Sequence, residues 1–301
     1  MPPSASNRPG WHGESLTPYV FLTPTLLALA VVFFYPMLVA IWMSLHSGGL
    51  GMQIGRFAGL AEYRRVLASP YFWNSLQVSV IFALGNLVGT WILGLGTALM
   101  LQRSFPGRGI ARALVIIPWA IPYVAAALIW GWMFDYTFGV LNYIFRTLHL
   151  ISKNTGWLTG CPAALWSLTG VSVWKLFPLG TVMFLAGLQT IPAELYEAAR
   201  VDGAGRLMSF RHVTLPGIRA VGVVLTLLIT IWAFGRAFTI IYILTEGGPA
   251  GCTETLVIRT YLEAFKFFHP GTGAALGTIV LLISLAFALV YLRAAYRPER
   301  R

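Results

Sequence analysis

Charge is the scarcest feature of this 301-residue sequence. Only 10% of its residues are Asp, Glu, Lys or Arg, against about 25% in typical soluble domains. Hydrophobic residues make up 57% of the chain, and the mean hydropathy is +0.73. This balance excludes an ordinary soluble domain, because so much apolar surface requires lipid as its solvent.

Residues for metal binding, nucleotide binding and acid–base catalysis are also sparse. The five histidines and two cysteines show no metal-ligand spacing. None of the three lysines, Lys153, Lys175 and Lys266, follows a glycine, which excludes the Gly-Lys-Ser/Thr of a phosphate-binding loop. The ten acids lie outside the long apolar runs or at their margins. An intramembrane enzyme or a self-sufficient ion-coupled transporter would need such groups at membrane depth, so both classes are disfavoured.

Long apolar runs are what the sequence does contain. A helix that crosses the hydrocarbon core needs about 20 mostly apolar residues. Six stretches qualify, at about 19–45, 74–101, 112–134, 163–188, 218–244 and 274–296. The second contains glycines at near four-residue spacing. Such spacing favours a helix packed closely inside a bundle, and the alternative is a lipid-facing helix that merely tolerates glycine.

The distribution of Lys and Arg predicts the orientation. With the N-terminus inside, the inner segments hold 12 of these residues, the outer segments hold 7, and two lie within spans, which accounts for all 21. The excess on the inner side predicts that both termini are cytoplasmic. Because the cations lie at the ends of apolar segments, the net charge of +11 indicates membrane orientation and not nucleic-acid binding.

Two tails flank the predicted membrane domain at 19–296. Residues 1–18 are polar, lack the apolar core of a signal sequence and are expected to form a disordered cytoplasmic tail. Residues 297–301 form a basic cytoplasmic tail.

Cys161 and Cys252 fall in outer connections, where a disulfide is possible. We expect two free thiols, because nothing in the sequence brings these connections together.

A polar segment, EAARVDGAGRLMSFRHVTLPGIRA at 197–220, separates the fourth and fifth spans. Pro192 suits the first position of a short helix, and the acids near its start favour the positive end of the helix dipole. Gly203 is suited to end this helix, because glycine readily adopts the left-handed conformation. A second helical turn leads to Pro216, which we expect to restart the chain as a membrane helix. These signals for the start and the end of a helix favour a role in docking to a protein over that of a merely solvated loop.

The pattern EAARVDGAG followed by VTLP resembles the EAA loop of bacterial ABC importer permeases, in the sugar branch of maltose- and glycerol-phosphate-type permeases. Other matching segments include FAGLAEYRRVL at 57–67, IIPWAIPYVAAALIWGWMFDYTFGVLNYI at 116–144 and IIYILTEGGPAGCTETLVIRTYLEAF at 240–265. The resemblance extends over nearly all of the chain from Tyr19. It implies an all-α membrane protein of the type I importer architecture, with six transmembrane helices and the EAA loop at about 190–217.

The resemblance also implies the partners. They are a second homologous permease, two ATP-binding-cassette ATPase subunits, a periplasmic or lipid-anchored substrate-binding protein and the lipid bilayer of the bacterial inner membrane. ATP and Mg²⁺ would be bound by the ATPase, so this chain would be a non-catalytic subunit without a cofactor. In the family, the EAA helix seats in a groove of the ATPase. The matching positions are Glu197, Ala198, Ala199, Asp202, Gly203, Leu215 and Pro216.

Two basic residues, Lys175 and Arg236, are predicted within spans. A Lys or Arg at a helix centre costs roughly 2.5–3.5 kcal/mol on insertion scales, so such residues usually face a cavity or a partner. With the positions implied by the resemblance, the candidate pathway residues are Ser172, Trp174, Lys175, Thr230, Phe234 and Arg236. The alternative is that the aromatic residues among and beside them serve only packing or the membrane interface.

The cargo implied by the resemblance is a neutral carbohydrate. The two intramembrane cations leave an anionic, glycerophosphate-type cargo as an alternative, beside an amino-sugar-type cargo and an ATP-independent transporter. On the outer side, the stretches 60–73 and 245–254 are expected to meet the binding protein, with Arg64 and Arg65 as candidate contacts.

Overall fold

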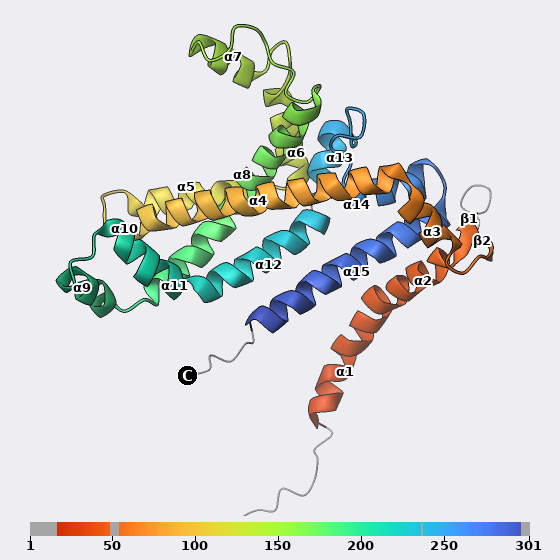
Figure 1. The fold of residues 1–301 in the computed structure, drawn as a ribbon, viewed down its shortest axis with the longest axis horizontal. Helices are drawn as coiled ribbons and strands as arrows, with labels where there is room; N and C mark the ends of the chain where they lie inside the picture. The colour runs from red at the N-terminus through yellow and green to blue at the C-terminus, as the bar shows by residue number, and fades with distance from the viewer. Residues whose placement is uncertain (1–16, 49–53, 236, 296–301) are drawn as a thin grey trace, which may run out of the picture.

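The computed structural model describes residues 17–48, 54–235 and 237–295, and its described part is mostly helical (Figure 1). Near the N-terminus the elements are α1 (Thr17–Leu29), the π-helical turn η1 (Ala30–Phe34), α2 (Tyr35–Ser44), β1 (His46–Gly48), β2 (Ile54–Phe57), α3 (Ala61–Ala68) and α4 (Pro70–Gln102). The middle of the chain forms α5 (Arg108–Ala120), α6 (Tyr123–Met133), α7 (Val140–Thr147), α8 (Cys161–Gln189), α9 (Ala193–Val201), α10 (Arg206–Ser209), η2 (Phe210–Thr214) and α11 (Leu215–Gly217). The last elements are α12 (Arg219–Gly235), α13 (Phe238–Thr245), α14 (Leu256–Tyr261), η3 (Leu262–Lys266) and α15 (Pro270–Ala295).

The predicted spans correspond to helices of the structure. Within the described residues, four helices are long and apolar enough to cross a membrane, and there are six spans if each of two bent helix pairs counts as one. The pairs are α5 with α6, bent by 96°, and the segment 206–217 with α12, bent by 67°. The all-α class is therefore confirmed, and the described helices are compatible with between four and six spans. The third and fifth spans, however, are not the straight helices that the apolar runs predicted.

The pair formed by α4 and α8 is the centre of the bundle. Glycines of α4 allow the close approach: a Cβ at Gly85 would lie 2.7 Å from Thr169 Cγ2, and one at Gly89 would lie 2.6 Å from Val173 Cγ2. Gly94 sits against the backbone of Gly180. The prediction that the glycine-spaced helix packs inside the bundle is confirmed, because larger side chains at these positions would push the helices apart.

The predicted third span, 112–134, is broken between α5 and α6. Ile121 and Pro122 both adopt extended backbone conformations, with ψ of 131° and 144°. Proline has no N–H to continue the helical hydrogen bonds and disfavours the helical conformation of the residue before it. The chain therefore turns by 96° within a segment that hydropathy alone reads as continuous.

The predicted fifth span, 218–244, is divided as well. Its α12 begins at Arg219 and ends at Gly235, and a separate helix, α13, begins at Phe238. Arg236 lies outside the described residues. The two-stranded hairpin of β1 and β2 is antiparallel and lies at the opposite end of the long axis from α9 (Figure 1).

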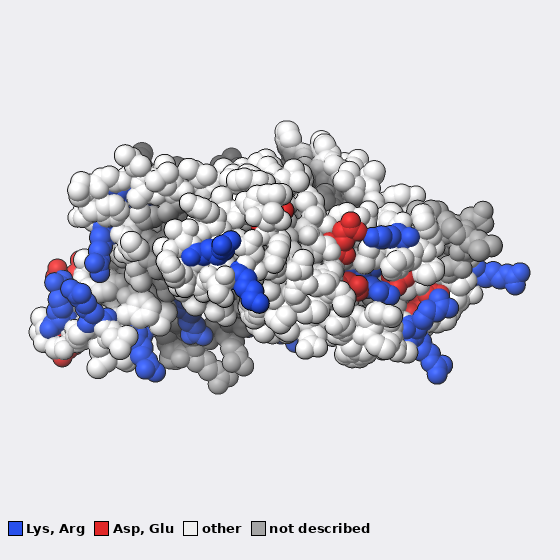
Figure 2. All heavy atoms as spheres, turned by 90° about the horizontal axis from the view of Figure 1, so that it is seen from above, with Lys and Arg blue, Asp and Glu red and all other residues white. Residues whose placement is uncertain are grey.

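The end of the molecule that carries α3 is held by a buried carboxylate. Glu62 of α3 is fully buried and accepts a 2.7 Å hydrogen bond from Thr272 Oγ1 of α15. Arg65, one turn along α3, pairs with Glu62 at 2.8 Å. Figure 2 shows charged side chains gathered at both ends of the long axis, and further Lys or Arg side chains near its middle on the face in view.

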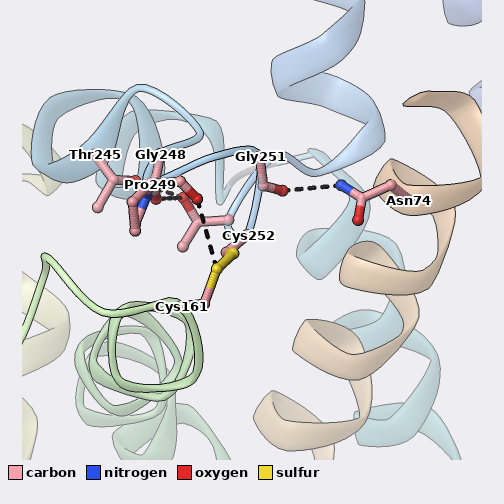
Figure 3. Close-up of a disulfide and its surroundings, with 8 residues drawn as sticks. Asn74, Cys161, Thr245, Gly248, Pro249, Gly251 and Cys252 are labelled. Carbon is pink, nitrogen blue, oxygen red and sulfur yellow. Dashed lines mark hydrogen bonds between the residues drawn. A yellow bond between two sulfur atoms is a disulfide. The ribbon is translucent and has the colours of Figure 1, made fainter. Parts of the chain in front are cut away.

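Cys161 and Cys252 form a disulfide, so the expectation of two free thiols is wrong (Figure 3). Their Cα atoms are 5.3 Å apart, within the usual range for a disulfide. The loop after α13 returns over the first turn of α8, where Asn74 Nδ2 of α4 donates a 2.9 Å hydrogen bond to the carbonyl of Gly251. This long-range contact brings the thiols together, and no local sequence signal encodes it.

Candidate functional sites

The helix α9 is the most exposed helical element among the candidate sites. It lies at one end of the bundle, away from α3 and the hairpin (Figure 1), and none of its residues is buried. Glu197 and Ala198 are exposed and Ala199 is half-buried. The chain thus presents a short helix with small side chains and an acid at its surface, and its packing against the bundle does not use this face.

The end of α9 is a Schellman motif. Gly203 adopts φ of +77°, the left-handed conformation that the sequence predicted. The N–H of Ala204 donates to the carbonyl of Ala199 at 2.8 Å, and the N–H of Gly203 donates to that of Arg200 at 3.1 Å. These are the two hydrogen bonds that define the motif. Asp202 occupies the C-cap position and is exposed. The end of α9 at Gly203 is therefore as predicted, whereas Pro192 is the N-cap residue and not the first residue of the helix, which begins at Ala193.

A side-chain hydrogen bond ties α9 to the segment that follows. Tyr196 Oη and Thr214 Oγ1 are 3.1 Å apart, and Thr214 is only 4% exposed. No local sequence pattern indicates either residue, because only the folded loop brings them together. Leu215 and Pro216 form part of the short helix α11 and are both exposed. Pro216 does not restart the membrane helix as expected, since α12 begins at Arg219 after the 67° bend.

A basic cavity of about 810 Å³ lies between α9 and the end of α4. Arg103, Arg200 and Arg206 contribute to its wall, and no Asp or Glu does. Tyr196 also lines this cavity. The exposed face of α9 therefore lies next to this positively charged cavity.

Lys175 lies on α8 with its side chain 2% exposed. Its Nζ donates hydrogen bonds to the carbonyls of Pro118 at 2.9 Å and Trp119 at 3.1 Å, and also to that of Ile121. Pro118 and Trp119 belong to the last turn of α5 and Ile121 is its C-cap residue, where no following helical N–H is available to the carbonyls. Lys175 therefore satisfies the backbone groups that the α5–α6 break exposes. All three of its donors are used in this way.

The remaining described pathway candidates also make contacts within the chain. Ser172 is 5% exposed, and the ring of Trp174 meets that of Trp130 edge-on at 5.5 Å. On α12, Thr230 donates to the carbonyl of Thr226 at 2.8 Å, and Phe234 is 5% exposed. Arg236 lies outside the described residues.

The outer candidates Arg64 and Arg65 are both exposed on α3. Arg65 donates to both carboxylate oxygens of Glu62, at 2.8 and 2.9 Å. The loop at 245–254 is held by several contacts, among them the disulfide and a 3.0 Å hydrogen bond from Ser75 to Glu254. Both outer stretches thus have a fixed local structure.

Comparison with known proteins identifies the family. The model for binding-protein-dependent transport system inner membrane components matches residues 91–299. The trehalose/maltose transport system permease protein of Thermococcus litoralis is 38% identical over 285 residues, which are 94% of each chain. The sulfoquinovosyl glycerol transport system permease protein of Agrobacterium fabrum is 33% identical over 282 residues, covering 93% of this chain and 91% of its own length.

Among solved structures, the fold is similar to a chain of the bacterial alginate ABC transporter in complex with alginate pentasaccharide-bound periplasmic protein. The TM-score is 0.80 at 19% identity, and the match covers 94% of this chain and 95% of that chain. This likeness shows the fold alone. With the family match over residues 91–299 and the two relatives above 30% identity, the chain is a multi-pass membrane protein that belongs to the binding-protein-dependent transport system inner membrane components.

Proposed function

We propose that this chain is a permease subunit of an ATP-driven importer and forms half of the pathway for a carbohydrate. The observation that carries the proposal is the exposed helix α9, which bears the Glu197-Ala198-Ala199 pattern and ends in a Schellman motif at Gly203. The chain that contains this helix belongs to the transport-system family named above. A helix that leaves small and acidic side chains unpacked at the end of a membrane bundle suits insertion into a groove on another protein.

The connections of α9 explain how docking would act on the bundle. One end continues into α8 through 190–192, and the other continues through the helical stretch 206–217 into α12. The hydrogen bond between Tyr196 and Thr214 ties these two routes together. A displacement of α9 by a closing ATPase is therefore passed to both α8 and α12. Tilting of these helices against the second permease would open the pathway alternately to either side.

The chemistry of ATP hydrolysis is assigned to a separate subunit. The three lysines of the chain lie outside any Gly-Lys-Ser/Thr sequence, and among the described residues no group of His, Cys, Asp or Glu could hold a metal ion. ATP and Mg²⁺ would bind to two ATPase subunits. A substrate-binding protein would deliver cargo to the opposite end of the bundle, where α3 and the 245–254 loop lie.

The bacterial inner membrane is the proposed location, with α9 and both termini in the cytoplasm. Cys161 and Gln189 are the two ends of the same 29-residue helix, α8, which is about 43 Å long at 1.5 Å per residue. The disulfide therefore lies at the opposite end of the span from α9. A disulfide is most stable on the outer, oxidising side, which supports this orientation.

The cargo is proposed to be a neutral carbohydrate. The anionic alternative was motivated by two intramembrane cations, and the donors of one of them, Lys175, are directed to carbonyls of α5. Among the relatives, the permease named for trehalose and maltose supports a neutral sugar. The one named for sulfoquinovosyl glycerol, whose sugar bears an anionic sulfonate, supports only the broader carbohydrate or glycoside class.

Reconstitution tests the proposal. The complex that co-purifies with this chain is placed in liposomes with its binding protein, and uptake of radiolabelled maltose, trehalose and glycerol-3-phosphate is measured with and without ATP. We expect ATP-dependent uptake of a sugar. Sugar uptake that is independent of ATP, or uptake of glycerol-3-phosphate alone, would contradict the proposed function.

A further inference from the structure

Five aromatic rings form a continuous series between the outer segments and the interior of α8. Trp174 meets Trp130 at 5.5 Å between ring centroids, and Trp130 meets Phe134 at 5.4 Å. Phe134 then meets Trp157 at 6.3 Å, and Trp157 meets Phe145 at 5.5 Å. These residues come from α6, α7, α8 and the segment before α8, so the fold and not local sequence assembles the series.

The outer part of this series lines a cavity of about 400 Å³. Trp166, Ser167 and Gly170 of α8 form another part of its wall. The volume falls in the range of about 300–1,000 Å³ typical of small-molecule sites. Trp166 is 58% exposed, so much of its indole is available to a molecule that enters.

Polar groups are placed among these rings. Among the described residues, the buried Nε1 of Trp130 has no hydrogen-bond partner. Ser167 Oγ donates to the carbonyl of Trp157 at 3.0 Å, which leaves its oxygen lone pairs able to accept. The indole of Trp157 is itself held, since its Nε1 donates to the buried Asn142 at 3.1 Å. A fixed aromatic face beside an unsatisfied donor and an acceptor suits a ring-shaped ligand that bears hydroxyl groups.

We propose that this cavity is a carbohydrate subsite at the outer part of the translocation pathway, with Trp166 and Trp157 as stacking surfaces for a sugar ring. The proposal rests on the proposed function and adds a location for the cargo outside the pathway residues predicted from sequence. A lipid chain or the second permease are the competing occupants, and the test separates them.

The first comparison uses the chemistry of stacking. A lipid chain accepts any apolar surface, whereas a sugar ring requires an aromatic face. Trp166→Phe keeps a ring, and Trp166→Leu keeps only apolar bulk. The matched control is Trp132→Leu, because Trp132 is 59% exposed on α6 and is absent from the residues that line the cavity.

The second comparison fills the cavity. Gly170 lines it, and a Cβ added there would meet nothing within 4 Å, so we expect the side chain of Gly170→Leu to extend into the cavity. Gly96 on α4 also has open space at its Cβ position and does not line the cavity. Gly96→Leu is therefore the control for an added side chain on a membrane helix.

The readouts are sugar uptake into proteoliposomes, ATPase activity stimulated by the loaded binding protein, and recovery of the second permease on purification. The sugars are maltose, trehalose and diacetylchitobiose, and variants are compared on those that the wild type imports. We expect Trp166→Leu to lower the initial uptake rate about three- to tenfold, in line with the strength of an aromatic contact. Trp166→Phe and Trp132→Leu should stay within about twofold. Gly170→Leu should lower uptake at least tenfold, Gly96→Leu should not, and ATPase stimulation should persist.

Each other outcome has a distinct meaning. Equal uptake by Trp166→Leu and Trp166→Phe would show that transport needs no aromatic face here, as expected if lipid fills the cavity, and would overturn the subsite while the proposed function stands. Loss of the second permease from Gly170→Leu but not from Gly96→Leu would make the cavity a subunit interface and also overturn it. If the wild type imports no sugar of the set, the proposed cargo fails together with the subsite. If Trp166→Leu does not assemble, the comparison of Gly170→Leu with Gly96→Leu decides.

Discussion

Replacing Lys175 by methionine keeps the length of the side chain but removes its three donors. The carbonyls of Pro118, Trp119 and Ile121 then lose the hydrogen bonds that the structure gives them. Each buried acceptor left unsatisfied costs about 1–3 kcal/mol, so the loss is roughly 3–9 kcal/mol before compensation. Removing a buried ammonium recovers several kcal/mol of desolvation. We therefore expect a net destabilisation of about 2–4 kcal/mol.

The comparison with Lys175→Gln separates this role from a role in selecting charged cargo. Glutamine also removes the charge, but its amide has two donors that can serve part of the α5 turn. A structural role therefore predicts that Lys175→Met is the less stable of the two, whereas charge selection predicts that the two variants behave alike and lose anionic cargo only.

Thermal unfolding of the purified protein in detergent, followed by size-exclusion fluorescence, gives the measurement. A loss of 2–4 kcal/mol corresponds to roughly 4–16 °C in Tm for a chain of this size. The control is Lys266→Met, because Lys266 is half-exposed and its ion pair with Glu246 lies at the surface. A Lys175→Met protein as stable as the wild type would refute the reasoning.

Three further changes are informative. Gly89→Ala should destabilise the α4–α8 pair by about 1–3 kcal/mol through overpacking, because its Cβ would lie 2.6 Å from a neighbouring side chain. The control is Gly96→Ala, whose Cβ meets nothing within 4 Å. Gly89→Ala should have the lower Tm of the two, and equal Tm values would mean that the helices separate freely. Cys252→Ser should lower the stability by about 2–5 kcal/mol, and alkylation with mass spectrometry should find one free thiol in it and none in the unreduced wild type. The hydrogen bond to Glu246 and the charge of that carboxylate raise the pKa of Lys266 above its ordinary 10.5. This contact therefore stabilises the fold below that pH and is lost as the pH rises through the raised pKa. Glu246→Gln should speed acylation of Lys266 at about pH 10, because more of the amine is then neutral, and an unchanged rate would contradict the contact.

The membrane spans and the loop at 190–217 could be predicted because their signals are local. Apolar runs of sufficient length indicate the spans, and the spacing of small residues indicates the face of α4 that approaches α8. Gly203 is a further case, since the left-handed conformation needed to end α9 is one that glycine adopts readily. In each case the residue and its structural consequence lie within one or two helical turns.

The features that sequence reasoning missed depend on contacts between distant segments. The hydropathy of 112–134 predicted one continuous helix, although Pro122 and the residue before it, Ile121, already indicated a possible break. The assignment of Lys175 to a cargo pathway followed from the cost of a buried charge, and only the structure reveals the carbonyls of α5 as its partners. The disulfide required the return of the 245–254 loop over α8, which no spacing of Cys161 and Cys252 could indicate.

The central claim is that α9 and its flanking residues dock an ATPase. Its most direct test is purification of the tagged chain from gently solubilised membranes, with identification of the chains that accompany it, for the wild type and for a Glu197→Lys, Gly203→Val variant. The valine should disrupt the end of α9, because Gly203 has φ of +77°, a conformation that β-branched residues rarely adopt. The account predicts that the wild type retains a second permease and an ATPase and that the variant retains the permease but loses the ATPase. A wild-type chain purified alone, or a variant that keeps its ATPase, would contradict it.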